Sequence, residues 1–248
     1  MHTNIWLPDP TLPGFRPFML DFFWRLNSLT NAILRALGES LQLSEADTEA
    51  MLRIHTGHNN QLRLLHYPPV PAGLLESKVK ARMPAHTDWC SFTLLFQDDC
   101  GGLELEDPRQ KGRFLAATPV EGALVLNIGD MWQRVSNGTW FRRSSPPASY
   151  DGKGSADALK GRFNSATHRV ALPPLEERYE GAERMTRARY AIPYFCAPDH
   201  DALIKVYESL VERDGEKKYE DVVFKDYGAW IAKYQYKDEG VNGNAEEK

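Results

Sequence analysis

The sequence predicts a mainly β protein with flanking α-helices, built on a double-stranded β-helix (jelly roll) core with surface helices at both ends. Two observations support this class. Between residues 61 and 200, short apolar runs alternate with turn residues at close spacing, as in antiparallel sandwiches and barrels. On both sides of that region, apolar residues recur at helical spacing. We expect one domain over 1–248, since all-β folds of this length are often single domains.

Residues 1–60 are expected to form a helical lead-in. The first helix, over about 17–37, carries apolar residues at helical spacing, and Gly38 is placed as a C-terminal cap. The second helix, over about 44–53, begins at Ser44, a favourable N-cap residue with Asp47 three positions later. Both helices are amphipathic, so we expect them on the outside of a sheet.

The core is expected over 61–200. The Asn137-Gly138 pair between strand-like runs predicts a hairpin turn. The last part, 201–248, reads as C-terminal helices followed by a polar tail from 238 onward. The expected strands are 61–67, 82–88, 91–96, 102–106, 113–117, 123–128, 130–135, 163–170 and 187–196.

One segment, 141–162, is polar, rich in Gly, Ser and Pro, and without periodicity. We expect it to be a loop insertion in the core. Two hypotheses account for it: a surface loop over the functional site, or a translated, unspliced intron in a gene model that is also short at its N-terminus. A transcript that lacks these codons would rule out the loop.

The candidate metal ligands are His86, Asp88 and His168. His86 and Asp88 are two residues apart on an expected strand, so their side chains project from the same face. His168 lies on a later strand of the same expected sheets. A single histidine on a strand is more often a hydrogen-bonded structural residue. Together, however, two imidazoles and one carboxylate that leave positions open are the ligand set of non-haem Fe(II) oxygenases.

A candidate anion site lies on another expected strand. Arg189 has apolar neighbours, and its guanidinium could hold a carboxylate with two parallel hydrogen bonds. The alternative is an arginine at a strand edge, solvated or paired with an acidic residue. Tyr67 could donate a phenolic hydrogen bond to the same carboxylate, although packing is the more common role for such a residue.

Taken together, these segments resemble the 2-oxoglutarate- and Fe(II)-dependent dioxygenases of the isopenicillin N synthase-like class. The matching segments occur in family order and are more specific in combination than any one of them. They are Leu62–Pro69, Ala85–Asp88, Gly101–Leu105, Leu126–Met131, Ser136–Gly138, Thr167–Val170 and Arg189–Ala191.

The resemblance implies that His86, Asp88 and His168 bind Fe(II), and that Arg189 and Tyr67 bind 2-oxoglutarate as cosubstrate. It implies an oxidoreductase that uses O2 to hydroxylate, desaturate or cyclise a small molecule, in specialised metabolism. No catalytic residue is expected beyond the metal site. The alternatives are an oxidase of the same fold that needs no keto-acid, and a non-catalytic or partner-dependent paralogue that retains the metal site.

The chain differs from the family pattern in three respects. The family's Arg-x-Ser is replaced by an Arg-x-Ala ending at Ala191, and an Asn two residues before Tyr67 is replaced by Leu65. Family members also usually have a further helix-and-strand segment on the N-terminal side. We therefore expect an exposed sheet edge or apolar surface, with a protein partner or a dimer as its possible cover.

Composition bears on the binding partners and on the cellular compartment. The net charge of −4 gives no reason to expect a nucleic acid or an anionic membrane as partner, and no apolar run approaches the length of a membrane span. The three cysteines show no metal-binding spacing and cannot all pair. Buried thiols in a reducing cytoplasm are the simplest interpretation.

Overall fold

The computed structural model describes residues 4–76, 82–138, 163–172 and 184–234. The expected loop at 141–162 and the expected polar tail lie outside these residues.

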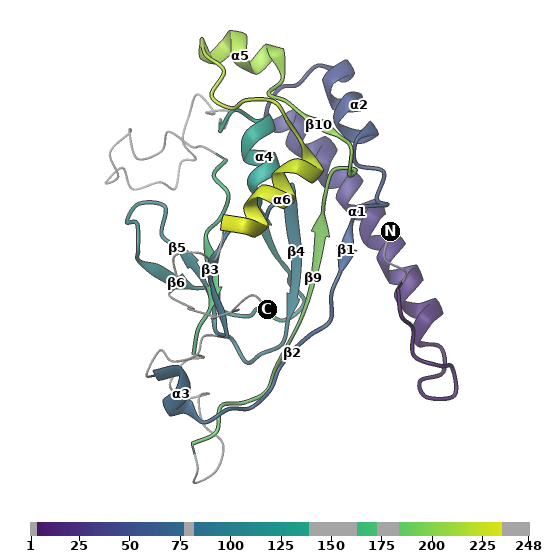
Figure 1. Cartoon of the computed structure of the whole chain (residues 1–248), viewed down its shortest axis with the longest axis vertical. Coiled ribbons are helices and arrows are strands. Elements are labelled where there is room, and N and C mark those ends of the chain that lie inside the picture. Colours follow the sequence, from purple (N-terminus) through teal and green to yellow (C-terminus); the bar gives the residue numbers. More distant parts are fainter. Residues whose placement is uncertain (1–3, 77–81, 139–162, 173–183, 235–248) are drawn as a thin grey trace, which may run out of the picture.

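Two antiparallel sheets form the core and confirm the expected jelly roll (Figure 1). The larger sheet has the order β1–β9–β4–β7, with β2 also pairing with β9, and the smaller sheet has the order β3–β8–β5–β6. The larger sheet comprises β1 (Gln61–Leu62), β2 (Leu65–Tyr67), β4 (Phe92–Gln97), β7 (Val125–Ile128) and β9 (Arg189–Cys196). The smaller sheet comprises β3 (Met83–His86), β5 (Leu103–Glu106), β6 (Phe114–Ala116) and β8 (His168–Val170).

Helices cover the outer side of the larger sheet (Figure 1). α1 (Phe15–Ser40) packs against β9 and against α2 (Glu45–Arg53). As predicted, Ser44 caps α2, and its hydroxyl accepts a hydrogen bond from the Asp47 backbone N–H at 3.1 Å. The prediction for Gly38 was wrong, because α1 continues to Ser40. A Cβ on Gly38 would lie 3.2 Å from Thr48 Oγ1 of α2, so the glycine serves close helix packing.

The region expected as a strand at 130–135 is instead a helix, α4 (Asp130–Val135). Its buried apolar residues Met131, Trp132 and Val135 have the spacing of one helix face, whereas in a strand Met131 and Trp132 would point to opposite faces. The hairpin predicted at Asn137-Gly138 is also absent. Both residues have positive φ, 56° and 64°, and the Gly138 N–H donates to Gln133 O at 2.8 Å. The pair therefore ends α4, because a helix C-terminus and a tight hairpin need the same left-handed backbone.

The C-terminal part contains the expected helices, α5 (Glu208–Asp214) and α6 (Phe224–Tyr234), and a short helix, α3 (Ala72–Glu76), follows β2. A two-stranded ladder of β10 (Leu203–Ile204) and β11 (Val222–Val223) was not expected. Four residues of α6, Phe224, Lys225, Gly228 and Ala229, line the central cavity. In the described residues, no helix combines the length and apolarity that crossing a membrane would require.

Three large apolar side chains of α1 are open to solvent. Phe18, Trp24 and Leu29 are 65%, 44% and 41% exposed. The helical repeat places them on more than one side of α1, outside the stripe of buried residues that includes Leu26 and Leu34. The expected exposed apolar surface is therefore present on this helix.

Candidate active site

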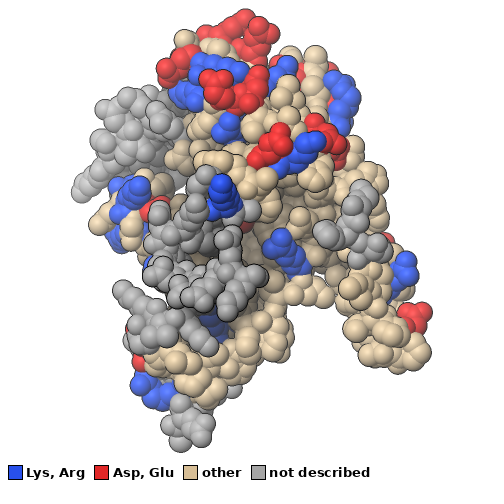
Figure 2. Space-filling view, viewed as in Figure 1, with Lys and Arg blue, Asp and Glu red and all other residues tan. Residues whose placement is uncertain are grey.

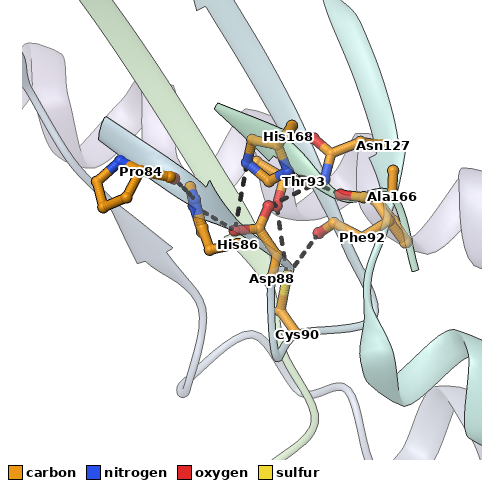
Figure 3. A network of polar contacts seen from close by, with 9 residues as sticks. All are labelled: Pro84, His86, Asp88, Cys90, Phe92, Thr93, Asn127, Ala166 and His168. Atoms are coloured by element: carbon orange, nitrogen blue, oxygen red, sulfur yellow. Dashed lines mark hydrogen bonds and ion pairs between the residues drawn. The ribbon is translucent and has the colours of Figure 1, made fainter. Parts of the chain in front are cut away.

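Strand pairing brings the two candidate histidines together. His86 ends β3 and His168 begins β8, and the two residues face each other in the antiparallel register. Their ring centroids are 4.3 Å apart. Asp88 follows β3 by two residues and reaches back between the two rings (Figure 3). A strand pair and a short loop thus place three potential ligands around one point.

The three side chains direct their ligand atoms toward one another. Asp88 Oδ1 lies 3.8 Å from His86 Nε2 and 3.8 Å from His168 Nε2, and the three ligand atoms all lie within 4.8 Å of one another. Each Nδ1 meets a backbone carbonyl at 2.8 Å, Pro84 O for His86 and Ala166 O for His168. Because a carbonyl can only accept, each Nδ1 carries the proton and each Nε2 is left free to ligate.

The second oxygen of Asp88 is held by two donors that the sequence did not reveal. Oδ2 accepts hydrogen bonds from Thr93 Oγ1 at 2.6 Å and from Asn127 Nδ2 at 2.9 Å, and Asp88 itself is buried. Thr93 lies on β4 and Asn127 on β7, so the larger sheet fixes a carboxylate that follows a strand of the smaller one. This arrangement turns Oδ1 toward the histidines (Figure 3).

Burial sets the charge state of the neighbouring groups. It lowers the pKa of His86, and the adjacent His168 lowers it further, so the imidazole is neutral near pH 7 and able to bind a metal. Burial raises the pKa of the Cys90 thiol well above its ordinary value. Cys90 Sγ lies 3.3 Å from Phe92 O, in keeping with the expectation of buried thiols.

Replacing Thr93 with valine is expected to lower metal affinity about 10- to 100-fold, because partners that orient a ligand contribute on that scale. Valine keeps the shape of threonine but leaves Asp88 Oδ2 with one donor fewer. Calorimetric titration with Mn(II) under anaerobic conditions measures the change. Thr56 makes a comparable hydrogen bond to Asp199, at 2.7 Å on the surface, so Thr56→Val is the matched control. Equal metal affinity of the two variants would contradict the prediction.

The same cavity contains the candidate anion site. The cavity has a volume of about 580 Å³, and its lining includes His86, Asp88, His168, Arg189 and Tyr67. Arg189 and Tyr67 face each other across β9 and β2, and the guanidinium carbon lies 5.1 Å from the centroid of the tyrosine ring. The structure therefore brings all five sequence-predicted site residues to one cavity.

Arg189 is buried among neutral partners. It is 1% exposed, and it donates from Nε to Gly101 O at 3.0 Å and from Nη2 to Gln97 Oε1 at 3.2 Å. Among the described residues, no carboxylate lies within 4.0 Å of it. Burial lowers the pKa of its guanidinium, which remains charged at neutral pH. Asp98 attracts the guanidinium from a distance but does not form an ion pair with it. A buried cation without an ion pair is costly, so this position fits a ligand carboxylate.

The sequence offered weak signals for the supporting residues. Asn127 and Gly101 lie in segments that match the family, while Thr93 and Gln97 are polar residues on the otherwise apolar β4. Thr93 and Gln97 could have been identified in the sequence as polar residues on the inner side of a buried strand. His200, an exposed residue, also lines the cavity.

A jelly roll with two histidines and one aspartate converging in its cavity defines the class of non-haem iron oxygenases. The chain belongs to the 2OG-Fe(II) oxygenase superfamily, whose family model matches residues 58–198.

Two curated relatives of the chain come from fungi. The chain is 34% identical over 219 residues to "2-oxoglutarate-dependent dioxygenase htyE" of Aspergillus rugulosus, covering 88% of this chain and 57% of that protein. It is 32% identical to "Proline hydroxylase buaE" of Petromyces alliaceus, covering 89% of this chain and 60% of that protein. The crystal structure of a full-length Neurospora crassa protein in complex with alpha-KG shares 32% identity and a TM-score of 0.70, covering 91% of this chain and 60% of that one. The chain thus spans less than two thirds of the length of these proteins.

Proposed function

We propose that this chain is an Fe(II)- and 2-oxoglutarate-dependent oxygenase that oxidises a small molecule with O2, and that residues 1–248 act as one domain. One observation carries the proposal. Three metal-ligand atoms converge within 4.8 Å in the cavity that also holds Arg189, a buried guanidinium without an anionic partner among the described residues. A metal ion and a carboxylate are the two ligands that such a cavity suits.

The residues fit a ferrous ion. Two neutral imidazoles and one carboxylate suit Fe(II), and no thiolate competes, since the described cysteines are all buried and Cys90 is held as a thiol. When bound, iron and 2-oxoglutarate supply the oxidation of a C–H bond by O2, coupled to conversion of the keto-acid to succinate and CO2.

The chain's own residues orient the reactants and exclude water. His86, Asp88 and His168 would hold the metal on one side and leave the cavity side open. Arg189 would bind the distal carboxylate of 2-oxoglutarate, with Tyr67 beside it. Apolar side chains from both sheets, Leu95, Leu103 and Val170, line the same cavity and keep water from the reacting atoms.

We propose that the reaction hydroxylates, desaturates or cyclises the substrate, and that it belongs to specialised metabolism. The cytoplasmic location is part of the same proposal and is supported by three free, buried thiols. The test is succinate formation by the purified chain with Fe(II), 2-oxoglutarate and O2 over a panel of small molecules. Bound iron without any substrate-stimulated succinate would contradict the proposal.

Arg189→Lys is expected to raise the KM for 2-oxoglutarate about 10- to 100-fold, because lysine keeps the charge but loses the fork that holds a carboxylate. Succinate formation against 2-oxoglutarate concentration measures it. Arg187 lies two residues away and pairs with Asp99 at 3.0 Å on the surface, so Arg187→Lys is the control and should leave this KM unchanged. An unchanged KM in Arg189→Lys would place the cosubstrate elsewhere.

A second candidate is an oxidase of the same fold that needs no keto-acid. Ala191, 2% exposed, lines the cavity beside Arg189 at the position where the family pattern has serine, so one hydroxyl donor for a bound keto-acid is absent. O2 consumption that depends on a substrate but not on 2-oxoglutarate would favour this candidate.

We also propose that a protein partner or a second copy of the chain covers the exposed apolar surface, as expected from the sequence. The alternative function of a partner-dependent paralogue belongs to the same proposal. The exposed apolar side chains of α1 support it, since Phe18, Trp24 and Leu29 are all substantially exposed. Light scattering during size-exclusion chromatography tests it. A monodisperse monomer that turns over 2-oxoglutarate without a partner would contradict it.

A further inference from the structure

A second basic side chain, Arg63, lines the cavity at the other end of the wall that holds Arg189. Alternate residues of the segment 61–67 face inward, from Gln61 through Arg63 and Leu65 to Tyr67. The Arg63 N–H donates to Pro193 O at 3.0 Å, which places Arg63 opposite Pro193 on β9. Arg189 lies four positions away along that strand.

The side chain of Arg63 contacts an aromatic ring and an amide, and neither group carries a charge. Its guanidinium carbon stands 5.0 Å from the centroid of the Phe195 ring, and Nη2 donates to Gln61 Oε1 at 2.7 Å. Within the described part of the chain, no carboxylate lies within 4.0 Å of it. Lys225, another basic residue of the lining, is by contrast paired with Asp201 at 2.6 Å.

The charges on this face are unevenly spread. In Figure 2, acidic side chains gather mainly toward the end of the molecule that holds α5, and separate basic side chains stand in the middle of the face. Because Gln61 turns its carbonyl oxygen toward Arg63, the amide nitrogen of Gln61 is available as a second donor. This end of the cavity therefore presents donors and positive charge, although the chain as a whole has a net charge of −4.

We propose that Arg63, with Gln61 beside it, binds a carboxylate of the primary substrate, and that this substrate is an apolar monocarboxylic acid. The inference rests on the proposed function and names the substrate class. Four strand positions separate the two arginines by about 13 Å, too far for one molecule of 2-oxoglutarate to pair with both. One planar guanidinium suits one planar carboxylate. Between the two ends the wall is apolar, formed by Leu65, Leu95 and Ala191.

The test is calorimetric binding to protein loaded with Mn(II) and saturating 2-oxoglutarate, which occupies the Arg189 site and avoids turnover. The probes are 3-phenylpropionate, indole-3-acetate, decanoate and N-acetyl-leucine, each paired with its own primary amide. At least one acid should bind about tenfold more tightly than its amide, because hydrogen bonds to a charged group contribute on that scale.

Arg63→Gln should bring that acid to the affinity of its amide, and Arg63→Lys should retain part of the preference. The matched control is Arg16→Gln, since Arg16 also stands over an aromatic ring, 5.6 Å from the centroid of Trp6, and does not line the cavity. Arg16→Gln should keep the full preference. Binding of 2-oxoglutarate is titrated separately, so failure of the proposed function is distinguishable from failure of this inference. No acid binding more tightly than its amide, or a preference retained in Arg63→Gln, would overturn it.

Discussion

Asp88→Asn is expected to reduce 2-oxoglutarate turnover at least about 1000-fold, since the metal contributes several kcal/mol and each tenfold in rate corresponds to about 1.4 kcal/mol. Asparagine has the shape of aspartate, so loss of packing is not the cause. Thr93 and Asn127 both donate toward the Oδ2 position. The new amide must therefore place its oxygen there, which turns its NH2 group toward the two histidines, and an NH2 group that carries two hydrogens cannot ligate a metal.

Metal content by mass spectrometry, succinate formation and the melting temperature together test this prediction. Asp21→Asn is the control, because Asp21 pairs with Arg25 at 2.6 Å on the exposed side of α1. The control should retain metal and activity, and the Asp88→Asn variant should stay folded without metal. Turnover above a tenth of the wild-type rate in Asp88→Asn would show that Asp88 is not a ligand.

Gly129→Ala is expected to destabilise the fold by about 3 kcal/mol, the upper range for overpacking a buried site. Gly129 joins β7 to α4 directly beside the loop that carries Asp88. A Cβ at this position would meet backbone atoms of that loop, Cys90 O at 2.2 Å and Asp88 O at 2.8 Å. Backbone atoms cannot avoid the new Cβ by changing rotamer, as a flexible side chain can, so the loop must move.

That movement also reaches the site, because three hydrogen bonds clamp the loop to this turn. Gly129, Asp130 and Met131 donate backbone N–H groups to Ser91 O, Asp88 O and Cys90 O at 2.9, 2.8 and 3.1 Å. The melting temperature should fall by about 6–12 °C, and metal affinity should fall with it.

Gly73→Ala is the matched control. Gly73 lies in α3, and a Cβ there would meet nothing within 4 Å, so alanine should be neutral or slightly stabilising. Calorimetric melting of both variants, with and without Mn(II), measures the difference. A Gly129→Ala variant as stable as Gly73→Ala would mean that the loop can relax without cost.

The sequence predicted the elements whose signals are long or regular. The periodic first helix, the Ser44 cap and most strands appear at or near the expected positions. The segment 130–135 was wrongly predicted as a strand, because its three apolar residues are too few for a clear period. The buried contacts of Met131, Trp132 and Val135 are those of a helix face. The Asn137-Gly138 turn was misassigned for a related reason, since positive φ at two residues serves either structure.

In the candidate site, the metal ligands were easier to predict than the residues that hold the ligands in place. Histidine and carboxylate side chains identify themselves by residue type, and their strand positions predicted that they converge. Thr93, Asn127 and Gln97 act only through the groups that they hold, and each of these hydrogen bonds joins residues from different elements of the fold. Only the pairing of the strands shows which of the many polar residues meets Asp88 or Arg189.

The guanidinium of Arg189 has a consequence for the stability of the protein before it binds a ligand. Folding withdraws this charge from water, and the described part of the chain gives it two neutral acceptors, a backbone carbonyl and an amide oxygen. The unliganded chain is therefore less stable than its packing would allow, and an incoming carboxylate relieves that deficit. At this position, the keto-acid carboxylate that binds Arg189 also supplies the interaction that the protein interior lacks.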